Sequence, residues 1–240
     1  MKRFLIILLI ATSCAPVYVP NARNAPMFKE GGEMQLNAQL SGTRGYEAQA
    51  GVAVSNHVGI ISNIAYAKSS STTEDDDYFR HSFFEGGIGY FDNSEKFAFE
   101  VYAGYGKGRG TVDGDFEIFD DPDGGEVRVR SRYQRFFIQP AIGSNHRRIF
   151  NWTGVLRMSV VDFTSFTSDG VEADLNADPV LFIEPAFIGK LNFGQTGIYA
   201  NFQAGLSFPR QEIDFDYEPV FVSIGLGVRF SLLGKPKTEE

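Results

Sequence analysis

The chain is poor in the residues from which disulfide scaffolds, metal sites and nucleic-acid interfaces are built. It has one cysteine and three histidines in 240 residues, which excludes a disulfide scaffold and a cysteine-rich metal site. It has 22 basic residues against 30 acidic ones, and the formal net charge of -8 argues against a nucleic-acid partner. Walker, Rossmann, zinc-helix and nucleophile-elbow motifs are absent from the sequence. We therefore expect no cofactor, no nucleic-acid partner and no catalysis.

Long apolar runs are also missing, except at the start of the chain. Lys2 and Arg3 precede the run Phe4 to Ala11, which is far too short to cross a bilayer as a helix. A basic start, a short apolar core and small residues are typical of a secretory signal, so we predict a signal peptide over residues 1–13. The lone cysteine, Cys14, follows at the expected cleavage point. The stretch from Ala11 to Cys14 resembles the lipobox of bacterial lipoproteins, which implies lipidation of Cys14; the alternative is an ordinary signal with an incidental cysteine.

Residues 14–32 contain three prolines and a glycine pair, Gly31-Gly32. Such a segment cannot form a helix or a central strand. We therefore predict a lipid-anchored tether over residues 14–32, a single domain over residues 33–233, and a polar C-terminal tail over residues 234–240.

The body of the chain alternates apolar and polar residues with a period of two. In the last predicted strand, Val222, Ile224 and Leu226 alternate with small polar residues and glycines. This period indicates half-buried strands and not helices. The ten predicted strands are 33–42, 45–55, 58–68, 78–91, 96–110, 127–144, 148–164, 179–191, 197–208 and 219–232.

The connections between these strands alternate between short and long, with one tight turn at Thr43-Arg44 on the long side. An even number of strands with this alternation is typical of a membrane barrel. We predict an all-β fold: a closed antiparallel up-and-down transmembrane β-barrel of about 10 strands. Pro140 and Pro185 each remove one donor from the strand ladder, so we expect bends or bulges there.

The less apolar face of the strands fits a narrow lumen better than a soluble exterior. It consists mostly of small and amide residues with a few spaced charges, and buried charges persist only when they are paired. The opposite face carries aromatic residues near both ends, as at Tyr90 and Tyr66, which suits a lipid interface. The predicted lumen charge network consists of Glu47, Glu85, Glu100, Arg135, Arg157, Glu184, Lys190 and Arg229.

The alternating body, including the segment Arg132 to Pro140, resembles the small outer-membrane β-barrel proteins of Gram-negative bacteria. The resemblance implies a location in the bacterial outer membrane, contact with outer-membrane lipid, and both barrel termini on the periplasmic side. Such barrels often end in an aromatic residue, whereas this chain continues past Phe230 to Glu240.

Charge is also sorted along the predicted barrel axis. Most acids lie in the long connections, and bases on the outward parity lie just below them. We predict that these bases form a collar that binds lipopolysaccharide phosphates, since arginine binds phosphate through two parallel hydrogen bonds; the alternative is that they only balance the acidic loops. The predicted basic collar consists of Lys68, Arg80, Lys107, Arg109, Arg128, Arg130, Arg132 and Arg210.

The acidic loops suggest a surface ligand and, as weak candidates for a Ca²⁺ or Mg²⁺ site, Asp120, Asp121 and Asp123. A solvated acidic loop is the simpler interpretation. His81 falls on the lumen parity near Glu85, where a paired structural histidine is the favoured interpretation over a catalytic base.

The predicted function is a structural or surface-interaction role. The first alternative is a narrow or gated pore for small solutes, and the second is a lipid-modifying enzyme or protease of the outer membrane.

Overall fold

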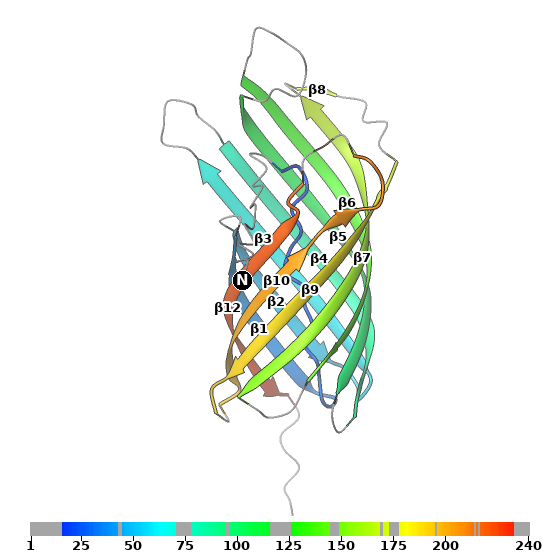
Figure 1. The fold of residues 1–240 in the computed structure, drawn as a ribbon, viewed down its shortest axis with the longest axis vertical. Coiled ribbons are helices and arrows are strands. Elements are labelled where there is room, and N and C mark those ends of the chain that lie inside the picture. Colours follow the sequence, from blue (N-terminus) through cyan, green and yellow to red (C-terminus); the bar gives the residue numbers. More distant parts are fainter. Residues whose placement is uncertain are drawn as a thin grey trace, which may run out of the picture.

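The computed structural model describes residues 16–42, 45–70, 78–94, 97–115, 126–144, 149–168, 170–172, 178–194, 196–213, 215 and 217–232. These residues form a closed barrel of tilted strands, with an extended segment of the chain inside it (Figure 1). None of the described residues belongs to a helix that is long and apolar enough to cross a membrane.

The barrel wall has ten long strands, as the sequence predicts. They are β1 (Glu33–Ser41), β2 (Gly45–Ala53), β3 (Val58–Ser70), β4 (Tyr78–Asn93), β5 (Ala98–Asp115), β6 (Glu126–Gly143), β7 (Phe150–Ser168), β9 (Val180–Asn192), β10 (Ile198–Leu206) and β12 (Val220–Ser231). Two short strands, β8 (Val171–Glu172) and β11 (Phe208–Pro209), extend the pairing beside β7 and β9.

Every wall strand pairs antiparallel with its two neighbours, and two pairings close the ring. β7 pairs with β9, and β1 pairs with β12 so that Glu33 lies opposite Ser231. The first and last strands therefore begin and end at the same end of the barrel, which is the end with the short turns. A closed ring leaves no unpaired sheet edge in the wall, which a barrel in lipid requires.

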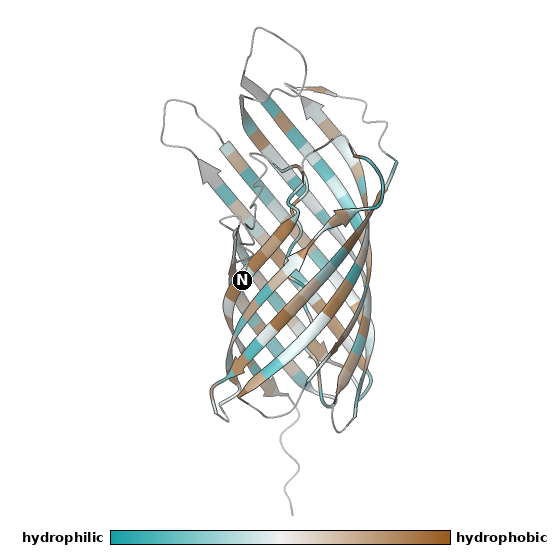
Figure 2. Cartoon of the chain, viewed as in Figure 1, coloured by the Kyte–Doolittle hydropathy of each residue, from teal (hydrophilic) through white to brown (hydrophobic). Residues whose placement is uncertain are grey.

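The outer face of the wall is apolar and the inner face is polar. Val222, Ile224 and Leu226 on β12 are 54%, 64% and 61% exposed, whereas Ser223 between them is buried inside. Figure 2 shows the same alternation of hydrophobic and hydrophilic residues along the strands. This geometry confirms the predicted orientation of the two faces, since a water-soluble barrel would place its apolar face in the lumen.

The expected irregularities occur near the prolines. The pairing of β6 with β7 skips Gln139 and Pro140, and a register shift lies further along at Arg132/Tyr133. The pairing of β9 with β10 and β11 is interrupted between Ala186 and Ile183, beside Pro185. Each proline lacks the N–H that the ladder needs at its position.

Residues 16–28, which the sequence predicts as part of a tether, instead lie buried inside the barrel. Tyr18, Arg23 and Phe28 are 0% exposed. The prolines do keep this segment out of the sheet, but they do not keep it out of the interior. We call residues 16–28 the plug segment.

The lipid-facing band provides a test of the orientation. Leu226→Lys should lower the free energy of unfolding by about 2–4 kcal/mol, because a lysine on the outer face near mid-membrane must leave water. Urea titration of the protein folded in lipid vesicles measures this change. Val171→Lys is the matched control, since Val171 in β8 is exposed beyond the barrel wall at the long-loop end. Equal effects at the two positions would contradict the orientation.

Candidate functional site: the occupied lumen

The plug segment runs along the lumen from one end to the other. Val17 packs with Val112 and Val129, which lie where β5 and β6 approach their long connection. Phe28 packs with Ala53 at the end of β2 and with Phe91 near the end of β4, beside the short turns. The chain thus enters the lumen at the long-loop end and leaves it at the short-turn end.

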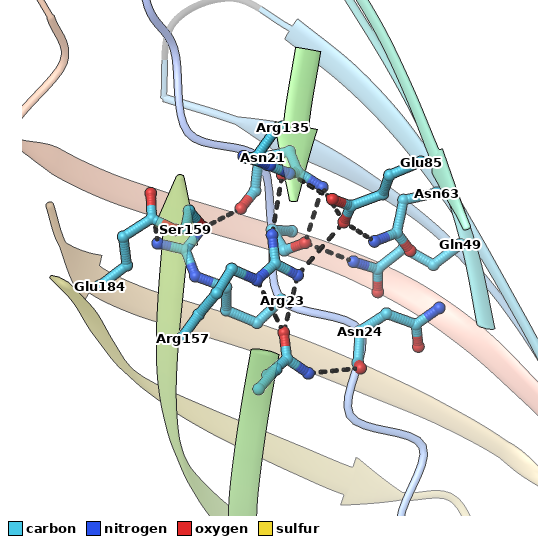
Figure 3. A network of polar contacts seen from close by, with 12 residues as sticks. Asn21, Arg23, Asn24, Gln49, Asn63, Glu85, Arg135, Arg157, Ser159 and Glu184 are labelled. Atoms are coloured by element: carbon cyan, nitrogen blue, oxygen red, sulfur yellow. Dashed lines mark hydrogen bonds and ion pairs between the residues drawn. The ribbon is translucent and has the colours of Figure 1, made fainter. Parts of the chain in front are cut away.

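A charge cluster joins the plug segment to the wall at mid-lumen (Figure 3). The carboxylate of Glu85 pairs with Arg135 and, at 3.2 Å, with Arg157. The Asn21 amide from the plug segment donates to Glu85 Oε1 at 3.0 Å. Its carbonyl oxygen accepts from Arg135 and from Arg157 Nη1. All four side chains are therefore held by one another.

A second carboxylate, Glu184, also receives the plug segment. Its Oε1 atom accepts from the Tyr18 hydroxyl at 3.0 Å and lies 3.6 Å from Arg23 Nη2. Its Oε2 atom accepts from the Ser159 hydroxyl at 2.8 Å. Arg23 is the single charged residue of the plug segment, and it lies against the wall carboxylate with both side chains 0% exposed.

Aromatic rings support the two wall arginines. The Arg135 guanidinium lies 4.2 Å from the Phe83 ring centroid, and that of Arg157 lies 4.6 Å from the Phe137 centroid. A guanidinium stacked on an aromatic face is stabilised by the quadrupole of the ring. The cluster is thus bounded by rings as well as by hydrogen bonds.

Wall side chains hydrogen-bond the plug backbone in place of a strand ladder. Gln203 accepts from the Arg23 N–H at 3.0 Å and donates to the Arg23 carbonyl at 2.9 Å. Glu47 accepts from the Ala22 N–H at 2.9 Å, and Gln49 donates to the Ala22 carbonyl at 3.0 Å. These contacts satisfy buried peptide groups that the prolines exclude from the sheet.

The same pattern continues toward the short-turn end. Gln139 donates to the Asn24 carbonyl at 2.9 Å. Lys190 donates to the Ala25 carbonyl at 2.9 Å and to the Pro26 carbonyl at 3.3 Å. Glu100 accepts from the Met27 N–H at 2.8 Å. Each residue from Ala22 to Met27 is therefore bound through its backbone by a wall side chain.

The structure places the predicted lumen charges on the inner face. Arg229 is partly buried, and the seven others are buried. They form no single network, since Glu85 and Glu184 lie in the mid-lumen clusters whereas Lys190 and Glu100 bind the plug segment further down. The amide side chains of Gln139, Gln203 and Gln49, and the plug residues themselves, were not among the residues predicted for the lumen.

His81 lies in the lumen at the long-loop end, where its parity predicts. It is 2% exposed, and its Nε2 atom is 2.8 Å from the Tyr133 hydroxyl. Its ring stacks with Phe83 and Tyr133. The hydrogen-bond partner of His81 is thus Tyr133, whereas the predicted partner Glu85 pairs with Arg135 and Arg157.

The predicted collar residues are all exposed; seven of them lie on the outward parity of wall strands, and Arg210 follows β11. Two pairs face each other across neighbouring strands, Lys68 with Arg80 and Arg109 with Arg132. Arg128 forms an ion pair with Asp113. Like charges directly opposite one another destabilise a sheet unless an anion lies between them.

The predicted metal candidates Asp120, Asp121 and Asp123 lie outside the described residues, as do Cys14 and the tail from residue 234. Within the described ranges, no group of three or more histidine, cysteine, aspartate or glutamate side chains could hold a metal ion.

Together, the closed wall, the apolar outer band and the occupied lumen define a membrane-spanning β-barrel. No protein-family model matches the chain, and no curated protein matches it. A major outer membrane protein from Thermus thermophilus is similar over 82% of this chain and 99% of its own, with a TM-score of 0.43 and 9% identity. The KdgM porin covers the same shares, with a TM-score of 0.39 and 11% identity.

The beta domain of the Bordetella autotransporter BrkA is similar over 84% of this chain and 99% of its own, with a TM-score of 0.41 and 10% identity. At these identities the likeness does not extend to what the three proteins do.

The Glu85 cluster can be tested by removing its charge. Glu85→Gln should lower the free energy of unfolding by about 3–5 kcal/mol, since it removes the carboxylate with which two buried arginines form ion pairs. The temperature at which the band shifts on a heat-modifiability gel, together with urea titration, measures the loss. Arg128→Gln is the control, because it breaks an ion pair in which Arg128 is 54% exposed and should cost less than about 1 kcal/mol.

Proposed function

We propose that this chain is a plugged β-barrel of the bacterial outer membrane with a structural or surface-interaction role. The observation that carries the proposal is the occupied lumen. A segment bound residue by residue, from Ala22 to Met27, fills the space through which a solute would pass. Ten strands enclose little more than side-chain volume, so one extended chain is enough to fill the interior.

The proposed orientation places the long loops at the cell surface and the strand termini in the periplasm. Long loops outside and short turns inside are the rule for barrels of the outer membrane. The acidic loops then face the medium, where they are available to a surface ligand. A signal peptide over residues 1–13 and lipidation of Cys14 belong to this proposal, supported by the sequence of the first 14 residues.

Conductance tests the proposal directly. The purified full-length protein in planar lipid bilayers should give no steady single-channel current, because the plug segment is held by buried charge clusters. A variant lacking residues 16–28 is the comparison, and its folded fraction is checked by heat-shift gel. Steady openings of the full-length protein would favour transport over the structural role.

The alternative is a gated pore, which one observation favours. The inner wall keeps a complete polar lining of amides and charges, including Gln39, Asn63 and Gln203, so it would form an aqueous channel if the plug segment left. Voltage- or ligand-dependent openings of the full-length protein would support this alternative.

We further propose that the basic collar binds the phosphates of lipopolysaccharide. The facing pairs Lys68–Arg80 and Arg109–Arg132 each present two cations to one point on the outer surface. A phosphate between two such side chains would relieve their repulsion and accept hydrogen bonds from both. Arg80 and Lys68 also lie over the rings of Tyr66 and Tyr78, at 5.8 and 5.6 Å, which holds both cations at the wall surface.

If the collar binds lipopolysaccharide, removing two of its charges should reduce the amount of lipopolysaccharide bound. Arg109→Gln combined with Arg132→Gln should weaken binding roughly thirtyfold, at about 1 kcal/mol for each base near an anionic surface. Lipopolysaccharide co-purifying with the protein, and its titration into the protein folded in detergent, measure the change. The control is Arg147→Gln with Arg148→Gln, in the connection between β6 and β7 at the short-turn end. Unchanged binding in the Arg109/Arg132 variant would contradict the collar.

A further inference from the structure

The direction of the plug segment sets which side of the membrane the chain's N-terminus occupies. At the long-loop end, the Glu218 N–H donates to the Tyr18 carbonyl at 3.0 Å, and Tyr18 pairs with Tyr217 in the long connection before β12. At the other end, Asn93 beside a short turn donates to the Phe28 carbonyl at 2.7 Å. The two ends of the segment therefore contact opposite ends of the barrel.

The path from the plug segment to the first strand is also fixed. Gly31 donates to Asn56 Oδ1 at 2.9 Å in the turn between β2 and β3. Gly32 donates to the Ala53 carbonyl at 2.7 Å and accepts from the Leu232 N–H at 2.8 Å. Strand β1 then begins at Glu33. The chain thus leaves the lumen and turns back into the wall at the short-turn end.

The segment is long enough to cross the apolar band. Extended chain without internal hydrogen bonds rises about 3.1 Å per residue, so Val17 to Phe28 spans roughly 35 Å. The apolar band of an outer-membrane barrel is about 25 Å tall. Cys14 lies outside the described residues and precedes Pro16 by two positions along the chain, which span at most about 7 Å. The described chain therefore begins, at Pro16, at the long-loop end of the lumen.

We propose that the barrel carries its own N-terminus through its lumen to the cell surface, so that a lipid on Cys14 is delivered to the outer leaflet. The inference rests on the proposed orientation, in which the long loops are outside. The lumen then serves as a sleeve for one extended peptide, and its side chains fix the direction of that peptide. In this arrangement the acylated N-terminus lies at the cell surface and stays attached to the barrel that displays it.

Surface labelling of intact cells tests the proposal. A ten-residue epitope tag is inserted between Ala15 and Pro16 of the full-length chain, which keeps the predicted lipobox and Cys14. Two further full-length variants carry the tag after Asp174 in a long connection and after Gly194 in a short turn. The expected result is antibody binding to intact cells for the first two variants, and only after permeabilisation for the third.

The controls separate this inference from the proposed function. If the tag after Asp174 is labelled on intact cells while the tag before Pro16 is protected, the N-terminus is not displayed and this inference fails alone. If only the tag after Gly194 is labelled, the orientation is inverted and both proposals fail.

A second insert guards against misfolding. A six-residue protease site at the same place should be cut by protease added to intact cells, with the barrel still heat-modifiable. An N-terminus that is free at the loop end should tolerate added residues, so loss of the folded barrel with both inserts would also overturn the inference.

Discussion

The interior of this barrel depends on the ion pairs and hydrogen bonds of the buried Glu85 carboxylate. It compensates Arg135 and Arg157 from the wall and accepts the amide of Asn21 from the plug segment. Charges withheld from water cost several kcal/mol each unless partners replace the lost solvation. Asn21 replaces part of the lost solvation of these charges, because its side-chain carbonyl accepts from both arginines and its side-chain NH₂ group donates to the carboxylate. Wall and plug segment are therefore one polar unit, and neither is satisfied without the other.

The prolines of the plug segment explain why it forms no strand and why wall side chains hydrogen-bond its backbone. Proline lacks the N–H that a ladder needs, so Pro16, Pro20 and Pro26 prevent the segment from adding a strand to the sheet. The remaining peptide groups still need partners in a closed interior. An amide side chain offers both acceptor and donor functions, which matches a peptide group, and Gln203 uses both functions on Arg23. Amides on the inward parity of the strands therefore do for this segment what a neighbouring strand would do.

The wall was predictable from the sequence and its occupant was not. A period of two fixes which residues share a face, so strand positions, the apolar exterior and the inward charges follow from local pattern. The contact of Tyr18 with Glu184 has no local pattern, since it joins residues 166 positions apart. The predicted lumen charges are four acids and four bases, and this balance did not indicate that a further segment lies among them. One signal was available: Tyr18, Met27 and Phe28 are apolar residues that flexible linkers seldom contain.

The wall itself is shaped around the plug segment. Gly51 and Gly59 face inward, and a Cβ atom on either would come within 3.0 Å of the Phe28 ring. Phe28 therefore occupies space that wall side chains would otherwise fill, and without it the wall would enclose a cavity that costs stability. The adjoining Met27 adopts a positive φ of 55°, a conformation that non-glycine residues adopt only when their surroundings fix it. The Phe28 ring lies at the short-turn end, and the Tyr18 hydroxyl donates to Glu184 nearer the loops, so the segment has one direction through the barrel. This direction, more than the occupancy of the lumen, distinguishes a barrel that displays its N-terminus from one whose lumen is only blocked.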